Sequence, residues 1–121
     1  MQLIPYAIPG TIIVKTIEEY FNFPPGTIFL RSREREIVMA RQISIWLDYQ
    51  EYKEKYNTNG WSCIARAYKL NHATIMHSVK TVNNDMCMRS YLQVVNSIQQ
   101  SIYGEVRYQR PQTVNQPLQL A

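Results

Sequence analysis

The chain has 121 residues, of which 45% are hydrophobic, and its 13 lysines and arginines outnumber its 9 aspartates and glutamates to give a net charge of +4. This length suits one domain with a core, and the mild positive charge favours a polyanionic partner. No apolar run could cross a bilayer and no signal peptide is visible, so we expect a cytoplasmic protein without membrane contact. Cys63 and Cys87 form no paired motif, and we expect buried or incidental thiols in a reducing compartment.

The spacing of apolar residues predicts an all-α protein, a small bundle of about five to six helices. After a proline-marked lead over residues 1–10, a first helix is predicted over about 11–22, with Thr11 as its cap. The break FPPG follows, and residues 27–30 look like a single turn or short helix that leads into the basic segment RSRERE.

The longest predicted helix runs from about Arg35 to Tyr56. Most of its circumference is apolar, so neighbouring elements must enclose it. Its polar residues make one narrow stripe, which we expect to face solvent: Arg41, Ser44, Asp48, Glu51 and Lys55. Its aromatic residues are assigned to the core: Trp46, Tyr49, Tyr52 and Tyr56.

Residues 61–84 predict a helix-turn-helix. Apolar positions from Trp61 to Tyr68 suit a short amphipathic helix, and the turn Lys69-Leu70-Asn71 places Asn71 as the N-cap of a second helix that begins at His72. One face of that second helix is apolar, with Ile75, Val79 and Val82, and the other is free for a partner, with Ala73, Thr74, His77, Lys80, Thr81 and Asn84. A helical hairpin that only packs is the alternative for this stretch.

The segment Asn83-Asn84-Asp85 is predicted to separate the helix-turn-helix from a final helix over about 86–103, which Gly104 ends. Met88, Tyr91, Leu92, Val95, Ile98 and Ile102 are expected on the buried side of this helix. From about Arg107 the chain is rich in glutamine and proline, which is typical of a flexible tail. The expected division is therefore a lead (1–10), a DNA-binding domain (11–104) and a tail (105–121).

Motifs for metal, nucleotide or catalytic chemistry are missing from the sequence. His72 and His77 are five residues apart, whereas two ligands on one helical face need a spacing of three or four, so we expect no metal site. There is no phosphate-binding Gly-x-x-x-x-Gly-Lys loop and no convincing set of catalytic residues. We expect no cofactor, no bound nucleotide and no enzymatic activity.

Two blocks, SREREIVMARQISIWL (32–47) and NHATIMHSV (71–79), together resemble the C-terminal DNA-binding domain of the bacterial chromosomal replication initiator, the DnaA family. The resemblance covers about residues 11–103 and implies binding to double-stranded DNA. It implies a minor-groove role for Arg33, helped by Arg31 and Arg35, and a phosphate-binding role for Arg41 and Gln42. It implies that the base-reading positions are Asn71, His72, Ala73 and Thr74, and that His77 and Lys80 contact the flanking backbone. Lys69 in the turn completes the expected contact set.

The chain departs from the family pattern at the start of the second helix of the motif. Where the family usually has Gly-Gly-Arg-Asp, this sequence has the shorter Lys69-Leu70-Asn71, and Ala73 replaces a threonine. Asparagine both donates and accepts hydrogen bonds whereas an ionised aspartate only accepts, so cytosine preference should weaken and adenine becomes possible at the base read by Asn71. We therefore expect a target site different from the usual one.

We expect a sequence-selective binder of double-stranded DNA, a monomer that acts as a replication-site binder or regulator. The initiator's ATPase module is missing from this chain, which is therefore either a standalone small protein, carried by a phage or mobile element, or a fragment. The initial methionine favours the standalone protein, and we expect replication proteins as further partners. The alternative is a protein-interaction module that keeps the fold without binding DNA. Exposed aromatic residues on the long helix, together with carboxylates paired to Arg33, Arg41 and Lys80, would favour that alternative.

Overall fold

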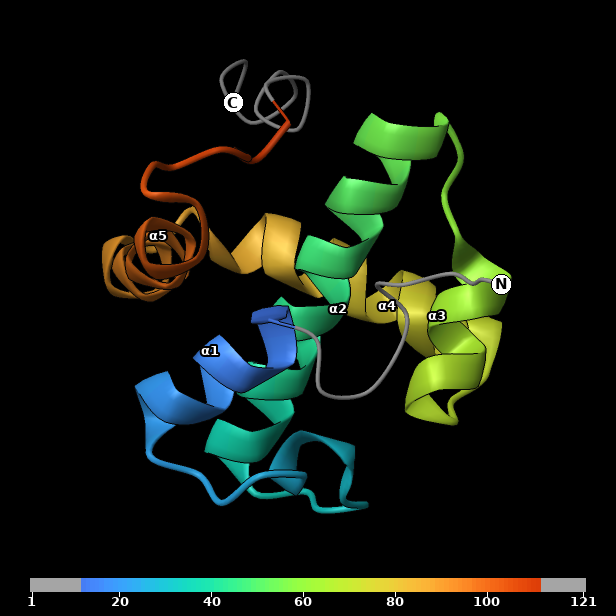
Figure 1. Ribbon diagram of the computed structural model, residues 1–121, viewed down its shortest axis with the longest axis horizontal. Helices are drawn as coiled ribbons and strands as arrows, with labels where there is room; N and C mark the ends of the chain where they lie inside the picture. Colours follow the sequence, from blue (N-terminus) through green and yellow to red (C-terminus); the bar gives the residue numbers. More distant parts are fainter. Residues whose placement is uncertain (1–11, 112–121) are drawn as a thin grey trace, which may run out of the picture.

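The computed structural model describes residues 12–111, which form helices joined by short turns (Figure 1). Within that range there is no strand, and the prediction of an all-α bundle is confirmed. None of the described helices is long and apolar enough to cross a membrane. In chain order the elements are α1 (Ile12–Phe21), the 3-10 helix η1 (Thr27–Phe29), α2 (Arg35–Tyr56), α3 (Trp61–Tyr68), α4 (His72–Asp85) and α5 (Arg89–Tyr103). Thr11, the expected cap of the first helix, lies outside the described residues.

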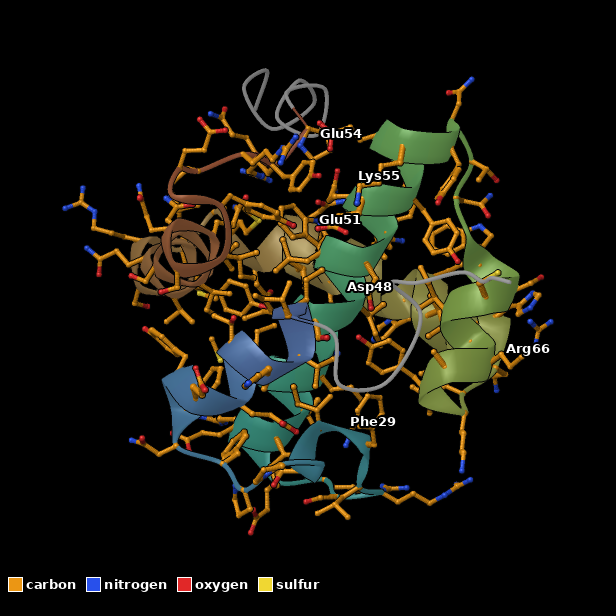
Figure 2. The ribbon with its side chains drawn as sticks, in the orientation of Figure 1. Phe29, Asp48, Glu51, Glu54, Lys55 and Arg66 are labelled. Atoms are coloured by element: carbon orange, nitrogen blue, oxygen red, sulfur yellow. The ribbon has the colours of Figure 1, made fainter. Side chains whose placement is uncertain are left out.

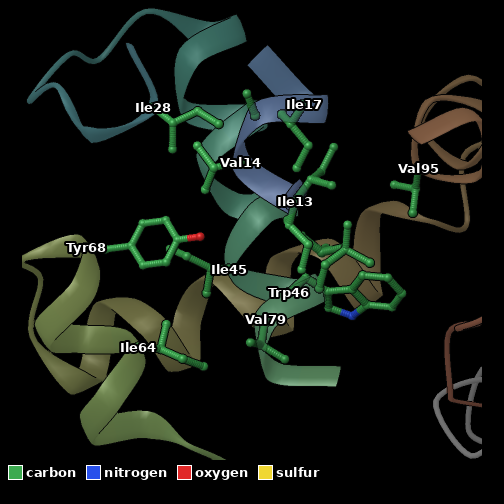
Figure 3. Packing of buried hydrophobic residues seen from close by; sticks show 14 of the residues in the cluster. Ile13, Val14, Ile17, Ile28, Ile45, Trp46, Ile64, Tyr68, Val79 and Val95 are labelled. Carbon is green, nitrogen blue, oxygen red and sulfur yellow. The ribbon is translucent and has the colours of Figure 1, made fainter. Parts of the chain in front are cut away.

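The long helix α2 runs through the centre of the molecule and contacts α1, η1, α3 and α4 (Figure 1). Its apolar circumference explains this position, because only surrounding elements can remove so much apolar surface from water. Figure 3 shows side chains from all five helices meeting around Ile45 and Trp46 of α2. Burying each such large apolar side chain contributes about 1.5–3 kcal/mol, and Trp46 is fully buried.

The polar stripe of α2 is buried over its central part, so the prediction that it faces solvent is wrong for Ser44, Asp48 and Glu51. Tyrosine hydroxyls from other helices explain the burial of these groups. The Tyr68 hydroxyl of α3 donates to Asp48 Oδ2 (2.6 Å) and shares a hydrogen bond with Ser44 Oγ. The Tyr103 hydroxyl of α5 donates to Glu51 Oε2 (2.6 Å). A polar stripe can thus be a packing surface when the facing helices supply partners.

The aromatic residues of α2 differ in burial along the helix. Trp46 and Tyr52 are buried as predicted, whereas Tyr56 in the last turn is 54% exposed, so its assignment to the core is wrong. Tyr49 is half-buried and stacks on Trp61 of α3, with ring centroids 4.8 Å apart and planes 3° from parallel. The last turn of α2 extends beyond the core, as the upper part of Figure 1 shows.

The junction of α4 and α5 lies later in the chain than predicted. α4 continues through Asp85, and the turn is formed by residues 86–88. Asn83 stays in the helix because its Oδ1 accepts a hydrogen bond from Trp46 Nε1 (2.8 Å), so its side chain joins α4 to α2 instead of ending a helix. Met88, expected on the buried side of the final helix, is 51% exposed in this turn.

The segment after Gly104 packs against the helices as far as it is described. Gly104 has a φ of 75° and ends α5 as predicted. The Gln99 side chain then fixes the following segment: its Oε1 accepts from the amides of Arg107 (3.0 Å) and Tyr108 (2.8 Å), and its Nε2 donates to the Tyr108 carbonyl (2.9 Å). The Tyr108 hydroxyl donates to Glu54 of α2 (2.7 Å). Residues 107–108 therefore have fixed packing, in contrast to the flexible tail expected from Arg107, while residues 112–121 lie outside the described range.

Candidate nucleic-acid interface

The turn between α3 and α4 has the predicted capping geometry. Lys69 adopts a left-handed conformation (φ 58°) that ends α3. Asn71 is extended, and its Oδ1 accepts a hydrogen bond from the amide of Thr74 (2.7 Å), which confirms its role as the N-cap of α4. The amide oxygen therefore faces the helix, and the NH₂ group of Asn71 points away from it. This differs from the expectation of a side chain that both accepts and donates toward a base.

The two faces of α4 are confirmed by burial. Ile75, Val79 and Val82 are buried against the rest of the bundle. The opposite surface is exposed, and we call it the α4 face: His72, Ala73, Met76, His77, Lys80 and Asn84. Thr74 is half-buried, with its carbonyl accepting a hydrogen bond from the Ser78 hydroxyl (2.9 Å). His77 Nε2 lies 3.3 Å from the hydroxyl of Thr81, which is half-buried one turn further along α4.

Residues 30–34, which we call the basic loop, follow η1 and lead into α2. The chain before the loop is fixed by Glu18 of α1, which is buried. Its Oε2 accepts hydrogen bonds from the amides of Gly26 (2.8 Å) and Ile28 (3.2 Å). A buried carboxylate with two backbone donors joins α1 to η1 and sets where the loop begins.

The Arg41 guanidinium holds the basic loop from the side of α2. Its Nε donates to the Ile28 carbonyl (2.9 Å), and its Nη2 donates to the carbonyls of Leu30 (2.5 Å) and Ser32 (3.3 Å). Partial burial lowers the pKa of Arg41 from its usual value, but an arginine stays charged at neutral pH. Arg41 is therefore a support for the loop and does not lie free on a solvent stripe, as the sequence suggested.

The basic loop lies beside the end of α4, and the residue before the loop contacts α3. Just before the loop, Phe29 contacts Tyr68, the last residue of α3, with ring centroids 5.3 Å apart. At its end, Arg33 and Arg35 line a hollow of about 590 Å³ together with Asp85 at the end of α4. Figure 2 shows Phe29 below Asp48 of α2.

The predicted contact residues are accessible. Three are half-buried, namely Arg41, Gln42 and Thr74, and the others are exposed: Arg31, Arg33, Arg35, Lys69, Asn71, His72, Ala73, His77 and Lys80. Among residues 12–111 the ion pairs are Lys55 with Glu51 (3.7 Å) and Arg107 with Glu54 (3.5 Å), so none of the predicted contact cations is paired with a described carboxylate. Figure 2 shows Glu51, Glu54 and Lys55 together on the upper half of α2, far from Phe29.

The observations that would favour a pure protein-interaction module are met only at one aromatic residue. Tyr56 is 54% exposed, whereas Trp46 and Tyr52 are buried and Tyr49 is half-buried. Arg33, Arg41 and Lys80 form no ion pair with a residue in the described range. The α4 face also contains a residue that sequence reasoning left out. Met76 is 49% exposed there, although it is large and apolar. Its spacing of four from both His72 and Lys80 was the available signal.

The similarity of this chain to known proteins covers most of the helices described above. Residues 11–82 match the family model described as the bacterial DnaA protein helix-turn-helix. The chain belongs to this family. Membership supports binding to DNA, because the family is a helix-turn-helix DNA-binding family and not a catalytic one. The match includes α1 to most of α4, whereas α5 and the segment fixed by Gln99 lie beyond it.

Several chromosomal replication initiator proteins DnaA are similar to this chain. The protein of Bacteroides thetaiotaomicron is 32% identical over 75 residues, which is 61% of this chain and 15% of that protein. The protein of Desulfotalea psychrophila is 28% identical over 78 residues, 64% of this chain and 15% of that protein. DnaA 2 of Chlamydia caviae is 28% identical over 71 residues, 59% of this chain and 14% of that protein. The similarity thus spans about 15% of the length of these relatives.

Proposed function

We propose that this protein binds double-stranded DNA sequence-selectively, with the α4 face in the major groove and Arg33 in the adjacent minor groove. The observation that carries the proposal is the position of the basic loop. Its exposed arginines have no described carboxylate partner. Arg41 of α2 holds the loop backbone, and α1 and α3 hold the residues just before it. Cations held in a fixed place lose little conformational freedom when they meet a polyanion.

The dimensions support simultaneous contact with two grooves. A helix of the length of α4, 14 residues, is about 20 Å long. Adjacent grooves of a duplex follow each other at about half of a 34–36 Å helical turn. Arg33 lines a hollow with Asp85 at the end of α4, so Arg33 and the start of α4 are separated by about the length of this helix. An arginine in a narrow minor groove meets concentrated negative potential, while the start of α4 meets base edges.

The biological role belongs to the same proposal. The replication initiators that resemble this chain suggest a replication-site binder or regulator. We infer that it binds DNA as a monomer. Its partners would include replication proteins, and its origin would be a phage or mobile element. Arg31 and Arg35 assist Arg33, while Gln42, Lys69, His77 and Lys80 contact phosphates and Asn71, His72, Ala73 and Thr74 meet bases. The functional unit on this proposal is the domain over residues 11–104.

Selection of bound duplexes from a random pool, followed by sequencing, tests the proposal. We expect one enriched motif, bound with a dissociation constant on the order of 10 nM or tighter at moderate salt. His72→Ala should reduce the preference for that motif over random DNA more than it reduces affinity for random DNA. A pool that shows no enrichment, or equal losses on both DNAs in the variant, would contradict sequence-selective reading by α4.

A further inference from the structure

Met76 lies in the middle of the α4 face and is not part of the buried core of residues 12–111. The side chain is 49% exposed, and residues at helical spacing on either side, His72 and Lys80, are exposed as well. Ala73 precedes it by three positions and is also exposed, so the two residues form an apolar strip within a polar surface. The core side of α4 is supplied by other residues, and the bundle does not need Met76 to fill it.

The chemistry of the major groove offers a ligand for such a strip. The C5 methyl of thymine is the apolar group that base pairs present there, and apolar side chains contact it. A methionine suits this contact because its unbranched, polarisable side chain adapts to an irregular surface. Met76 is one turn further along α4 than His72, which places it over a base next to the one that His72 meets.

We propose that Met76 is a specificity-determining residue that recognises a thymine methyl group in the major groove. The inference rests on the proposed function, since it requires the α4 face to enter that groove. The donor-only presentation of Asn71 agrees with it: the NH₂ group seeks an acceptor such as a purine N7 or thymine O4, so the start of α4 is suited to thymine and purine edges.

Replacement of thymine by uracil tests this contact because it removes only the methyl group. In the selected duplex, each thymine is changed singly to uracil, and binding is measured by fluorescence anisotropy. For the wild-type protein we expect one thymine whose replacement weakens binding about threefold to tenfold, the range for a buried methyl group. In Met76→Ala this uracil effect should disappear, whereas Met76→Leu, which stays apolar, should keep most of it.

Ile12→Ala is the matched control, because Ile12 is a large apolar residue that is 65% exposed but lies at the start of α1 and not on the α4 face. This variant should keep the full uracil effect. If the wild type binds its selected site and no thymine shows an effect, or if Met76→Ala keeps the effect, the inference is overturned while the proposed function stands. If no site can be selected at all, the proposed function fails and the inference fails with it. Urea unfolding of each variant checks that the fold is kept.

Discussion

At the scale of the residue, the contacts of Arg41 depend more on the shape of its guanidinium group than on its charge. Arg41 uses a planar fork to bind three carbonyls of η1 and the basic loop, at 2.9, 2.5 and 3.3 Å. A lysine ammonium carries the same charge but cannot reproduce this set of directions. We therefore expect the effect of Arg41 on DNA binding to run through the loop that it holds.

Arg41→Lys separates this supporting role from a direct phosphate contact. We expect the variant to lower DNA affinity about tenfold, because the loop arginines lose their fixed position although the net charge is unchanged. Amide hydrogen exchange in residues 30–34 should become faster in the free protein. Wild-type affinity in the lysine variant, with unchanged exchange, would show that charge at this position is sufficient.

Gly60 offers a second prediction, since both its backbone and its surroundings require glycine. Its φ is 68°, and an added Cβ would lie 2.4 Å from Cγ of the buried Tyr52 ring. Gly104 has a similar φ of 75° but open space around it, so it serves as the matched control. Gly104→Ala should cost about 1 kcal/mol of unfolding free energy, and Gly60→Ala about 2–4 kcal/mol, in urea unfolding. Equal costs would mean that the Tyr52 ring moves aside freely.

At the scale of the element, buried polar contacts dock α3 against α2. Tyr68 lies between Asp48 and Ser44 of α2 and contacts both by hydrogen bonds, and Phe29 covers it from η1. Burial raises the pKa of Asp48 well above its usual value, and the neighbouring Glu51 raises it further, while the hydrogen bond from Tyr68 lowers it. The first helix of the helix-turn-helix therefore depends on a carboxyl group that favours its neutral form.

This predicts a stability that falls as pH rises. Because the pKa of Asp48 is higher in the folded than in the unfolded protein, the folded state binds more protons between the two values. From about pH 4 upward, wild-type stability should therefore decrease relative to Asp48→Asn, by up to about 1.4 kcal/mol per pH unit until the folded pKa is reached. Asparagine keeps an oxygen that can accept from Tyr68. Parallel pH profiles of the two proteins in urea unfolding would exclude Asp48 as the titrating group.

The features predicted correctly from the sequence are those that depend on residues close to one another in the chain. The cap by Asn71 involves Thr74 three residues away, and the two faces of α4 follow from spacing alone. The burial of Asp48 could not be predicted in this way, because its partner Tyr68 is 20 residues distant. The same holds for Asn83, whose partner Trp46 is 37 residues distant and keeps α4 helical past an apparent turn.

In the candidate site, too, the contacts that the sequence did not predict join residues far apart in the chain. Exposure of Arg33, His72 and Lys80 was expected from their polar faces, and the structure agrees. The support of the basic loop by Glu18 and Arg41 was not foreseen, because both act on backbone carbonyls and amides, whose positions no side-chain pattern reveals. A polar residue in a long helix can thus face solvent or hold a distant loop, and spacing alone does not separate the two.

At the scale of the whole molecule, the ion pairs of the described residues lie away from the proposed DNA-binding side. In the described range, Glu51 and Glu54 of α2 bind tyrosine hydroxyls and lie near Lys55 and Arg107. The basic loop and the α4 face carry cations without such partners in residues 12–111. The net charge of +4 therefore understates the positive charge on the proposed DNA-binding side.

Salt dependence measures how many of these cations meet phosphates. If about four neutralise phosphates, the logarithm of the binding constant should fall against the logarithm of salt concentration with a slope of roughly −3.6. Lys80→Ala should make that slope shallower by about 0.9 and weaken all duplexes alike. Arg107→Ala removes an equal charge from the opposite part of the molecule, where Arg107 lies 3.5 Å from Glu54, and should leave the slope unchanged. If the two variants changed the slope equally, binding would depend on net charge alone, because only a defined interface can distinguish two lysine or arginine positions of equal charge.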